Sequence, residues 1–180
     1  MDARRATHLS KFLSLVLRHR PEAAGVRLDA AGWVGVEALL SGCAANGVPL
    51  TRDELFEIVE SNDKQRFALG GDRIRANQGH SVRIELGLPP SVPPPTLFHG
   101  TVARSLDAIR HEGLRPRGRT HVHLSPDRET ARKVGQRRGR PVVLEVDAAA
   151  MVAAGHTFRR SKNGVWLTEN VPPEYLTFPD

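Results

Sequence analysis

The chain has 180 residues and a formal net charge of +6, and 39% of its residues are hydrophobic. That is enough for one large domain or two small ones. The single cysteine, Cys43, excludes an intramolecular disulfide and a zinc site built from several cysteines. Because no apolar run reaches the length of a membrane helix or a signal peptide, we expect a cytoplasmic protein with no membrane partner.

Three helices and a hairpin are predicted in the first half of the chain. The first helix is predicted to be capped by Thr7 and to stop before Pro21, because apolar residues recur at the spacing of one helical face: Leu9, Phe12, Leu13, Val16 and Leu17. A weaker helical pattern follows over 36–43, and Thr51 and Glu54 form a capping box that opens a third helix. Strand-like alternation around a turn at Gly70-Gly71 predicts the hairpin. This order of elements predicts a winged-helix lobe over residues 1–88.

The composition changes once, at the proline-rich stretch 89–96. Five prolines within 89–95 exclude a helix or a central strand, so we expect an extended linker between two domains. The second lobe, residues 97–180, begins with a short strand and a helix that ends at Gly113. A polar helix begun by Asp127, a buried strand over 141–147, a short alanine-rich helix and two strands near 156–160 and 164–168 follow. These elements predict a compact α+β lobe.

The stretch RTHVHLSPD, residues 119–127, has an unusual polar pattern. If it is a strand, Arg119, His121, His123 and Ser125 share one face. A zinc site through His99 is disfavoured, because a third and usually a fourth ligand are needed, Cys43 lies in the other half of the chain, and the sequence has no HExxH or CxxC motif. A solvated surface and a ligand pocket are both compatible with this polar face. Arginine clusters at 115–119 and 128–140 favour a pocket for a polyanion such as nucleic acid or a dinucleotide, although a solvated helix face also accounts for them.

Four stretches occur together in order: LSKFLSLVLRHRP (9–21), NDKQRFAL (62–69), ANQGHS (76–81) and LFHGT to RTHVHLSPD (97–127). The ordered set resembles the KptA-type RNA 2′-phosphotransferases, known in eukaryotes as tRNA 2′-phosphotransferases. With GVWLT (164–168), the likeness covers nearly the whole chain. It implies an α+β protein with a winged-helix lobe on the RNA side and an ADP-ribosyltransferase-like lobe that binds NAD.

The resemblance also implies a two-step reaction. An internal RNA 2′-phosphate attacks the anomeric carbon of the nicotinamide ribose of NAD, nicotinamide leaves, and an RNA-2′-phospho-ADP-ribose intermediate forms. The ribose 2″-hydroxyl then attacks the same phosphorus. The products are RNA with a free 2′-hydroxyl and ADP-ribose 1″,2″-cyclic phosphate, and no metal is implied in either step.

The family's catalytic Arg-His-Arg-Arg set falls on Arg18, His19, Arg66 and Arg119. Guanidinium groups suit a phosphate monoester, which carries about −1.5 to −2 charges near neutral pH. His19 acts either as the acid that protonates the departing RNA oxygen or as a hydrogen-bond donor alone. Without the resemblance, each arginine has an ordinary structural explanation. Arg18 could cap a helix end, Arg66 could be an exposed strand residue, and Arg119 could belong to the arginine-rich background.

The NAD pocket is expected to contain His99, Gly100 and Thr101 from one strand, with His123 and Ser125 as its second wall. Gly100 is expected to let NAD approach the backbone closely, because glycine has no side chain.

The stretch after the hairpin is a second candidate for contacts with RNA. Gln78, His80 and Ser81 either hold RNA phosphates or form a structural turn. The role of His121 is left open. Val165 stands where protein-modifying relatives place an acid, and Glu169 lies slightly beyond it.

Three functions are compatible with the sequence. The favoured one is an NAD-dependent RNA 2′-phosphotransferase that acts as a monomer in RNA processing. The second is an ADP-ribosyltransferase that stops after the first step. The third is a non-catalytic winged-helix nucleic-acid binder, which the acidic third helix, TRDELFEIVESN, disfavours.

Overall fold

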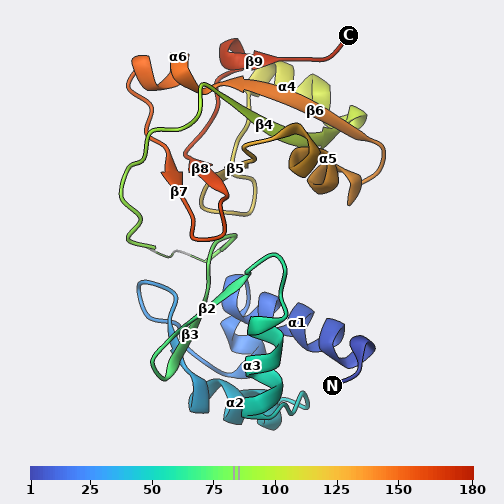
Figure 1. Ribbon diagram of the computed structural model, residues 1–180, viewed down its shortest axis with the longest axis vertical. Helices are drawn as coiled ribbons and strands as arrows, with labels where there is room; N and C mark the ends of the chain where they lie inside the picture. The colour runs from blue at the N-terminus through green and yellow to red at the C-terminus, as the bar shows by residue number, and fades with distance from the viewer. Residues whose placement is uncertain (83, 85) are drawn as a thin grey trace. The chain divides into compact units, whose positions relative to one another are not determined.

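The chain divides into two compact units, Met1–Gly87 and Leu88–Asp180. The computed structural model describes residues 1–82, 84 and 86–180, and Figure 1 shows the elements of each unit. Both units combine helices with small antiparallel sheets, which confirms the predicted α+β class. In the part of the chain that the structure describes, every helix is too short or too polar to cross a membrane.

The first unit packs three helices against a three-stranded sheet. The helices are α1 (Ala3–Arg18), α2 (Val36–Ala45) and α3 (Arg52–Glu60), and a 3-10 turn covers Pro21–Ala24. The strands β1 (Val34–Gly35), β2 (Phe67–Gly70) and β3 (Arg73–Ala76) form an antiparallel sheet in the order β1-β3-β2. The predicted stripe of α1 supplies the centre of the core, where Leu9, Leu13, Val16 and Leu17 are buried.

Helix α1 begins five residues earlier than predicted, because its N-cap is Asp2 and not Thr7. Asp2 caps the helix, because its side chain accepts a hydrogen bond of 2.8 Å from the Arg5 N–H. The Thr7 hydroxyl instead donates to the carbonyl of Ala3 within the helix. The prediction was wrong because threonine and aspartate are both good caps, and the apolar stripe does not extend into the first turn.

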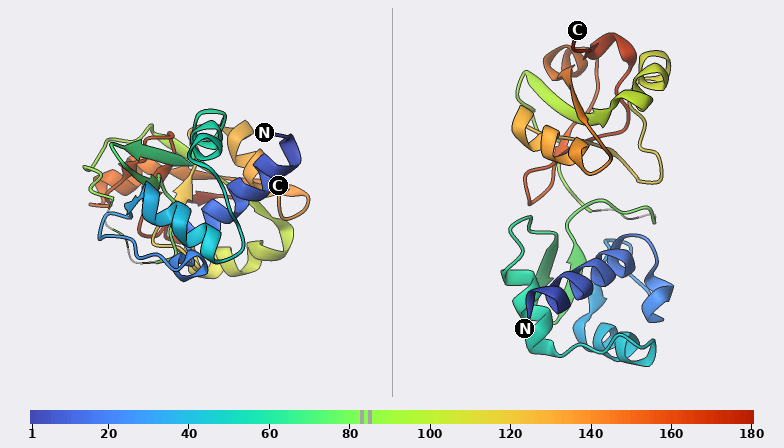
Figure 2. Two further views of the ribbon diagram at one scale, coloured as in Figure 1. Left: turned by 90° about the horizontal axis from the view of Figure 1, so that it is seen from below. Right: turned by 90° about the vertical axis from the view of Figure 1, so that its right-hand side faces the viewer.

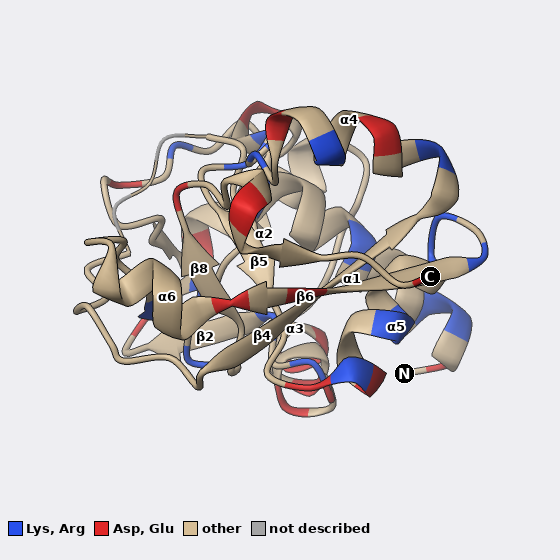
Figure 3. Cartoon of the chain, turned by 90° about the horizontal axis from the view of Figure 1, so that it is seen from above, with Lys and Arg blue, Asp and Glu red and all other residues tan. Residues whose placement is uncertain are grey.

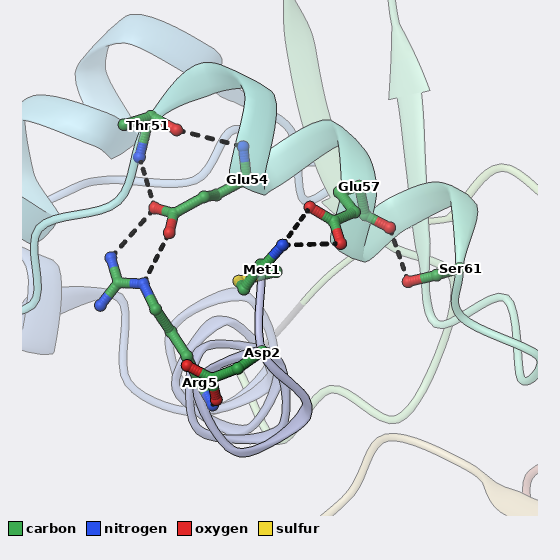
Figure 4. A network of polar contacts seen from close by, with 7 residues as sticks. All are labelled: Met1, Asp2, Arg5, Thr51, Glu54, Glu57 and Ser61. Carbon is green, nitrogen blue, oxygen red and sulfur yellow. Dashed lines mark hydrogen bonds and ion pairs between the residues drawn. The ribbon is translucent and has the colours of Figure 1, made fainter.

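Ionic contacts join the first turns of α1 and α3, as Figure 4 shows. The predicted capping box of Thr51 and Glu54 is confirmed. The Glu54 carboxylate also accepts two hydrogen bonds from Arg5, of 2.6 and 3.0 Å. These bonds, followed by the bond from the Thr51 backbone, lower the pKa of Glu54 to about 2. The cap of α3 is thereby also a contact to α1.

The hairpin turn lies one residue later than predicted. Gly70 pairs with Arg73, so the two-residue loop is Gly71-Asp72. Gly70 has a packing role instead, because a β-carbon there would lie 2.8 Å from the ring of Trp33.

The second unit contains two three-stranded antiparallel sheets. One has the order β4-β6-β9, formed by Thr96–Val102, Pro141–Asp147 and Leu176–Thr177. The other has the order β5-β8-β7, formed by Val122–Leu124, Trp166–Thr168 and Arg159–Arg160. The helices are α4 (Leu106–Glu112), α5 (Arg128–Gln136) and α6 (Ala148–Ala153), with 3-10 turns at Ala103–Ser105 and Pro173–Tyr175.

Helix α5 lies against strands β4 and β6, in both Figure 1 and the right-hand view of Figure 2. Its start is capped by Asp127, as predicted, because the carboxylate accepts a hydrogen bond of 2.7 Å from Thr130. The side of α5 that meets the sheet consists of small residues, Ala131 and Gly135, which are both buried. Small side chains let the helix backbone approach the strands closely.

The proline-rich stretch belongs to the second unit. The Ser91 N–H donates to the carbonyl of Phe158 at 2.8 Å, and Arg159 donates to the carbonyl of Leu88. Pro90 forms an isolated bridge with Arg159. The segment is extended, as its prolines require, and it packs beside β7.

The polar strand predicted over 119–125 is shorter than expected. Strand β5 covers Val122–Leu124, and Ser125 continues it as a bridge to Phe98. Arg119 lies in a turn in which its N–H donates to the carbonyl of Pro116 at 2.7 Å. The expected alternation therefore holds for Val122, His123 and Leu124, whereas Arg119 does not share a strand face with His123.

Candidate functional site

In the first unit, the predicted site residues lie where α1 ends. Arg18 is the last residue of α1, and His19 is its C-cap. The ring of His19 places Nδ1 2.9 Å from the Ser81 hydroxyl, and the Ser81 N–H donates to the carbonyl of Arg18 at 2.8 Å. The Arg18 side chain runs past Gly79, 3.5 Å from where a β-carbon there would lie. The end of α1 is therefore held by residues more than sixty positions away.

Arg66 is attached to the same segment, which we call the 77–81 strap (Asn77, Gln78, Gly79, His80 and Ser81). The Asn77 N–H donates to the carbonyl of Arg66 at 2.9 Å, and the Asn77 side-chain amide donates to the carbonyl of Gln65. Gln65 has a φ of 42°, the left-handed region that non-glycine residues rarely adopt. The strap thus fixes the strained backbone from which Arg66 projects, and it connects Arg66 with Arg18 and His19.

His80 lies inside the unit, with 1% of its surface exposed. Among the residues that the structure describes, its Nε2 atom has no hydrogen-bond partner. Burial is the largest cause that lowers the pKa of His80, and the positive charges of Arg18, Arg75 and His19 act in the same direction, so that the pKa is about 4. His80 is therefore a neutral interior imidazole, which favours the structural turn over a direct phosphate contact among the two alternatives left open for this residue.

In the second unit, a cavity of about 290 Å³ contains most of the predicted NAD-binding residues. That volume is at the lower end of the range for small-molecule clefts. Its polar and charged lining comes from β4, the 3-10 turn before α4, the loop after α4, β5 and the two residues after α5: His99, Thr101, Ser105, Arg115, Arg117, Arg119, His121, His123, Arg137 and Arg138. Figure 3 shows how Lys and Arg recur along α5.

His99 is held in one protonation state by its surroundings. Its Nδ1 lies 3.2 Å from the carbonyl of His123, so Nδ1 carries the proton and donates. Burial lowers the pKa of His99 and the charge of Arg138 adds to this effect, while the hydrogen bond to His123 opposes it. The neutral ring therefore presents Nε2 as a hydrogen-bond acceptor, which suits a hydroxyl group such as those of a ribose.

Arg119 and His123 form a pair within this lining. The Arg119 Nη1 atom lies 2.8 Å from the His123 Nδ1 atom. Because a guanidinium has donors and no acceptor, Nδ1 of His123 must accept, which puts the ring proton on Nε2. Burial lowers the pKa of Arg119, as do the charges of Arg138 and Arg137. Arg119 nevertheless stays a cation near neutral pH, since guanidinium begins from a pKa above 12.

Gly100 is required for a different reason from the one predicted. A β-carbon at Gly100 would lie 1.7 Å from the backbone oxygen of Ala131, in α5. The space beside Gly100 is therefore occupied by the helix backbone, and glycine at this position permits helix packing. Ser125 was also expected in the pocket, but it pairs with Phe98 through two backbone hydrogen bonds and is not part of the cavity lining.

The cavity lining has a surplus of positive charge. Arg117 forms an ion pair with Glu112 at 3.5 Å. Within the described residues, Arg115, Arg137 and Arg138 form no ion pair with a carboxylate. Guanidinium groups without a carboxylate partner favour an anionic ligand.

His121 lines the same cavity, and its surroundings indicate where Glu169 lies. Burial lowers the pKa of His121, the charge of Arg159 lowers it further, and Glu169 opposes both. The Glu169 carboxylate is therefore close enough to His121 to act on it electrostatically.

Several lining residues were not singled out from the sequence. Ser105, Ile109 and Val134 lie in the cavity wall, although each looks like an ordinary helix residue in the sequence. Arg137 and Arg138 were noticed as part of a charge cluster, but sequence alone does not separate them from the exposed arginines of α5. Their place in the lining depends on how α5 packs on β4.

The chain is similar throughout its length to a known family. A family model described as "RNA 2'-phosphotransferase, Tpt1 / KptA family" matches residues 4–170. A "Probable RNA 2'-phosphotransferase" of Streptomyces coelicolor is 59% identical over 179 residues, which are 99% of this chain and 98% of the relative. Proteins of the same name from Burkholderia pseudomallei and Nostoc punctiforme are 55% and 52% identical, over 97% and 98% of this chain and 96% and 98% of those relatives. The chain therefore belongs to the RNA 2'-phosphotransferase, Tpt1 / KptA family.

Proposed function

We propose that this protein is an NAD-dependent enzyme that removes an internal 2′-phosphate from RNA. The proposal takes RNA as one substrate and NAD as the co-substrate. Membership of the family supports the reaction. The single structural observation that carries the proposal is the cavity of the second unit, where three arginines that form no ion pair with a described carboxylate lie beside two histidines of defined tautomer.

The cavity fits the chemistry of a dinucleotide. Arg115, Arg137 and Arg138 supply positive charge for a pyrophosphate. The Nε2 acceptor of His99 and the Nε2–H donor of His123 suit the hydroxyls of a ribose. On this basis, we propose that the second unit is the ADP-ribosyltransferase-like lobe and that the first, with three helices and a β-hairpin, is a winged helix on the RNA side.

In the first proposed step, a 2′-phosphate oxygen of RNA attacks the anomeric carbon of the nicotinamide ribose. The bond from that carbon to nicotinamide breaks, and its electron pair leaves with nicotinamide, giving RNA-2′-phospho-ADP-ribose. The nucleophile is already an anion, so this step needs no general base, which is consistent with a valine, Val165, near the position of an acid in protein-modifying relatives.

In the second step, the ribose 2″-hydroxyl attacks phosphorus and the bond from phosphorus to the RNA 2′ oxygen breaks. We assign Arg18, Arg66 and Arg119 to the phosphate oxygens, where charge-assisted hydrogen bonds stabilise the crowded phosphorus centre. His19 donates a hydrogen bond or a proton to the departing RNA oxygen. The products are RNA with a 2′-hydroxyl and ADP-ribose 1″,2″-cyclic phosphate.

One assay tests the function directly. The protein is incubated with NAD and an RNA that carries one internal 2′-phosphate, and the cyclic phosphate is sought among the small products. Release of ADP-ribose 1″,2″-cyclic phosphate that depends on both NAD and the 2′-phosphate is expected. An adduct that forms and never resolves would instead indicate an ADP-ribosyltransferase, and binding of RNA without any reaction would indicate a nucleic-acid binder.

Two variants test the site assignment. His19→Ala and Arg66→Ala are expected to slow the second step more than the first, so labelled RNA–ADP-ribose adduct should accumulate on a gel. Arg4→Ala is the matched control, because Arg4 is an exposed arginine of α1, the helix whose C-cap is His19. Complete conversion by both site variants without any adduct would remove these residues from the second step.

A further inference from the structure

The 77–81 strap contacts all three residues of the first unit to which we have assigned catalytic roles. Its Ser81 N–H bonds the carbonyl of Arg18, its Ser81 hydroxyl contacts the ring of His19, and its Asn77 N–H bonds the carbonyl of Arg66. The strap is anchored from inside by buried His80, and Gly79 adopts a φ of 88° above the Arg18 side chain. A segment fixed at both ends in this way can hold a side chain in one orientation.

The contact between Ser81 and His19 has a chemical consequence. A hydroxyl both donates and accepts hydrogen bonds. If Ser81 donates to Nδ1 of neutral His19, the ring proton must lie on Nε2. If His19 is protonated, Nδ1 donates to Ser81 Oγ and Nε2 still carries a hydrogen. In both states Nε2 is a hydrogen-bond donor, which is what a phosphate oxygen or a departing RNA oxygen needs.

The alternative neutral form of His19 has its proton on Nδ1. In that form Ser81 accepts, and Nε2 presents a lone pair that cannot donate to an anionic substrate. The orientation of the Ser81 hydroxyl therefore decides whether neutral His19 can perform either of its two possible roles.

We propose that Ser81 is a positioning residue whose hydroxyl donates to Nδ1 of His19 and so keeps a proton on Nε2. Ser81 does not bind RNA in this assignment; it acts through His19. The role of His19 in turnover rests on the proposed function, whereas the state of its ring can be measured without substrate.

The first measurement is nitrogen NMR of the imidazole of His19 in the full-length protein at pH 8. In the wild type, we expect a protonated Nε2 and an unprotonated Nδ1. Ser81→Ala should shift the two nitrogen signals towards each other as the tautomers mix, and Ser81→Thr, which keeps a hydroxyl, should restore the wild-type pattern. Ser41→Ala is the control, because Ser41 is an exposed serine of the same unit, on α2.

The second measurement is turnover of the 2′-phosphorylated RNA. Loss of one hydrogen bond that orients a catalytic group corresponds to roughly a five- to tenfold change in rate. Ser81→Ala is therefore expected to lower kcat about tenfold with an unchanged KM for NAD, and Ser81→Thr should recover most of kcat. A structural defect would not be repaired selectively by a hydroxyl.

The two measurements separate the inference from the proposed function. A wild-type proton on Nδ1, or identical nitrogen signals in the wild type and Ser81→Ala, would overturn the role of Ser81 even if the enzyme is active. Conversely, the expected NMR pattern in a wild type that leaves 2′-phosphorylated RNA unchanged would refute the proposed function, while the hydrogen bond from Ser81 to His19 would stand.

Discussion

Acidification to pH 5 is expected to destabilise the first unit, because His80 is buried as a neutral imidazole. In the unfolded chain a histidine titrates near its ordinary pKa of 6.5, whereas His80 in the folded chain has a pKa of about 4. The unfolded state therefore binds more protons between these two values, and stability falls as the pH falls. The stability difference due to His80 is fully present above pH 6.5. It is lost progressively as the pH falls from 6.5 to 4, and the loss is complete below pH 4.

The two pKa values give the size of the effect. At pH 5 the linkage relation predicts a loss of about 2 kcal/mol in the free energy of unfolding relative to pH 8, with an upper limit of about 3 kcal/mol below pH 4. Arg18 and His19 from α1 and Arg75 from β3 are the charged groups that act on His80. The carboxylate of Glu54 is expected to add little to this loss of stability. Its pKa is 4.5 in the unfolded chain and about 2 in the folded one, so Glu54 is mostly ionised in both states at pH 5.

Urea unfolding of the full chain, followed by tryptophan fluorescence, measures this loss of stability in the first unit. Trp33 lies in the first unit and Trp166 in the second, so the fluorescence of a Trp166→Phe variant reports on the first unit alone. His80→Leu in that background removes the titrating group and serves as the control. Between pH 8 and pH 5, the free energy of unfolding of the His80→Leu variant should fall by about 2 kcal/mol less than that of the Trp166→Phe protein. An equal pH dependence in the two proteins would refute the reasoning.

Three further substitutions test single contacts. Gly100→Ala should lower stability by about 3 kcal/mol or more, measured by thermal unfolding of the second unit, because its β-carbon would overlap the backbone of Ala131; an unchanged Tm would contradict the packing described. Thr51→Ala should cost about 1 kcal/mol in urea unfolding through loss of the α3 cap, and no change in the urea midpoint would mean that water replaces the cap. His123→Ala should release Arg119 and slow NAD consumption in the proposed reaction roughly tenfold. His123→Asn, which keeps an acceptor, should be slowed less, and equal rates in both variants would argue against the pairing.

Features that depend on neighbouring residues were predictable from the sequence. The apolar stripe of α1, the capping box of Thr51 and Glu54, and the cap of α5 by Asp127 all involve residues three or four positions apart. Such patterns are fixed by helix geometry before any tertiary contact forms. The resemblance was also sufficient to identify the family, because its motifs are short stretches in a fixed order.

The roles of individual site residues required the tertiary structure. The sequence could not show that Gly100 faces the backbone of α5, that His80 is interior, or that Arg119 pairs with His123. Nor could it show that Ser81 contacts His19, from which it is separated by 62 positions. The physical reason is the same in each case: composition and spacing decide which segments form helices and strands, whereas packing between distant segments decides which side chain is buried, which proton a ring carries and which group is left for a ligand.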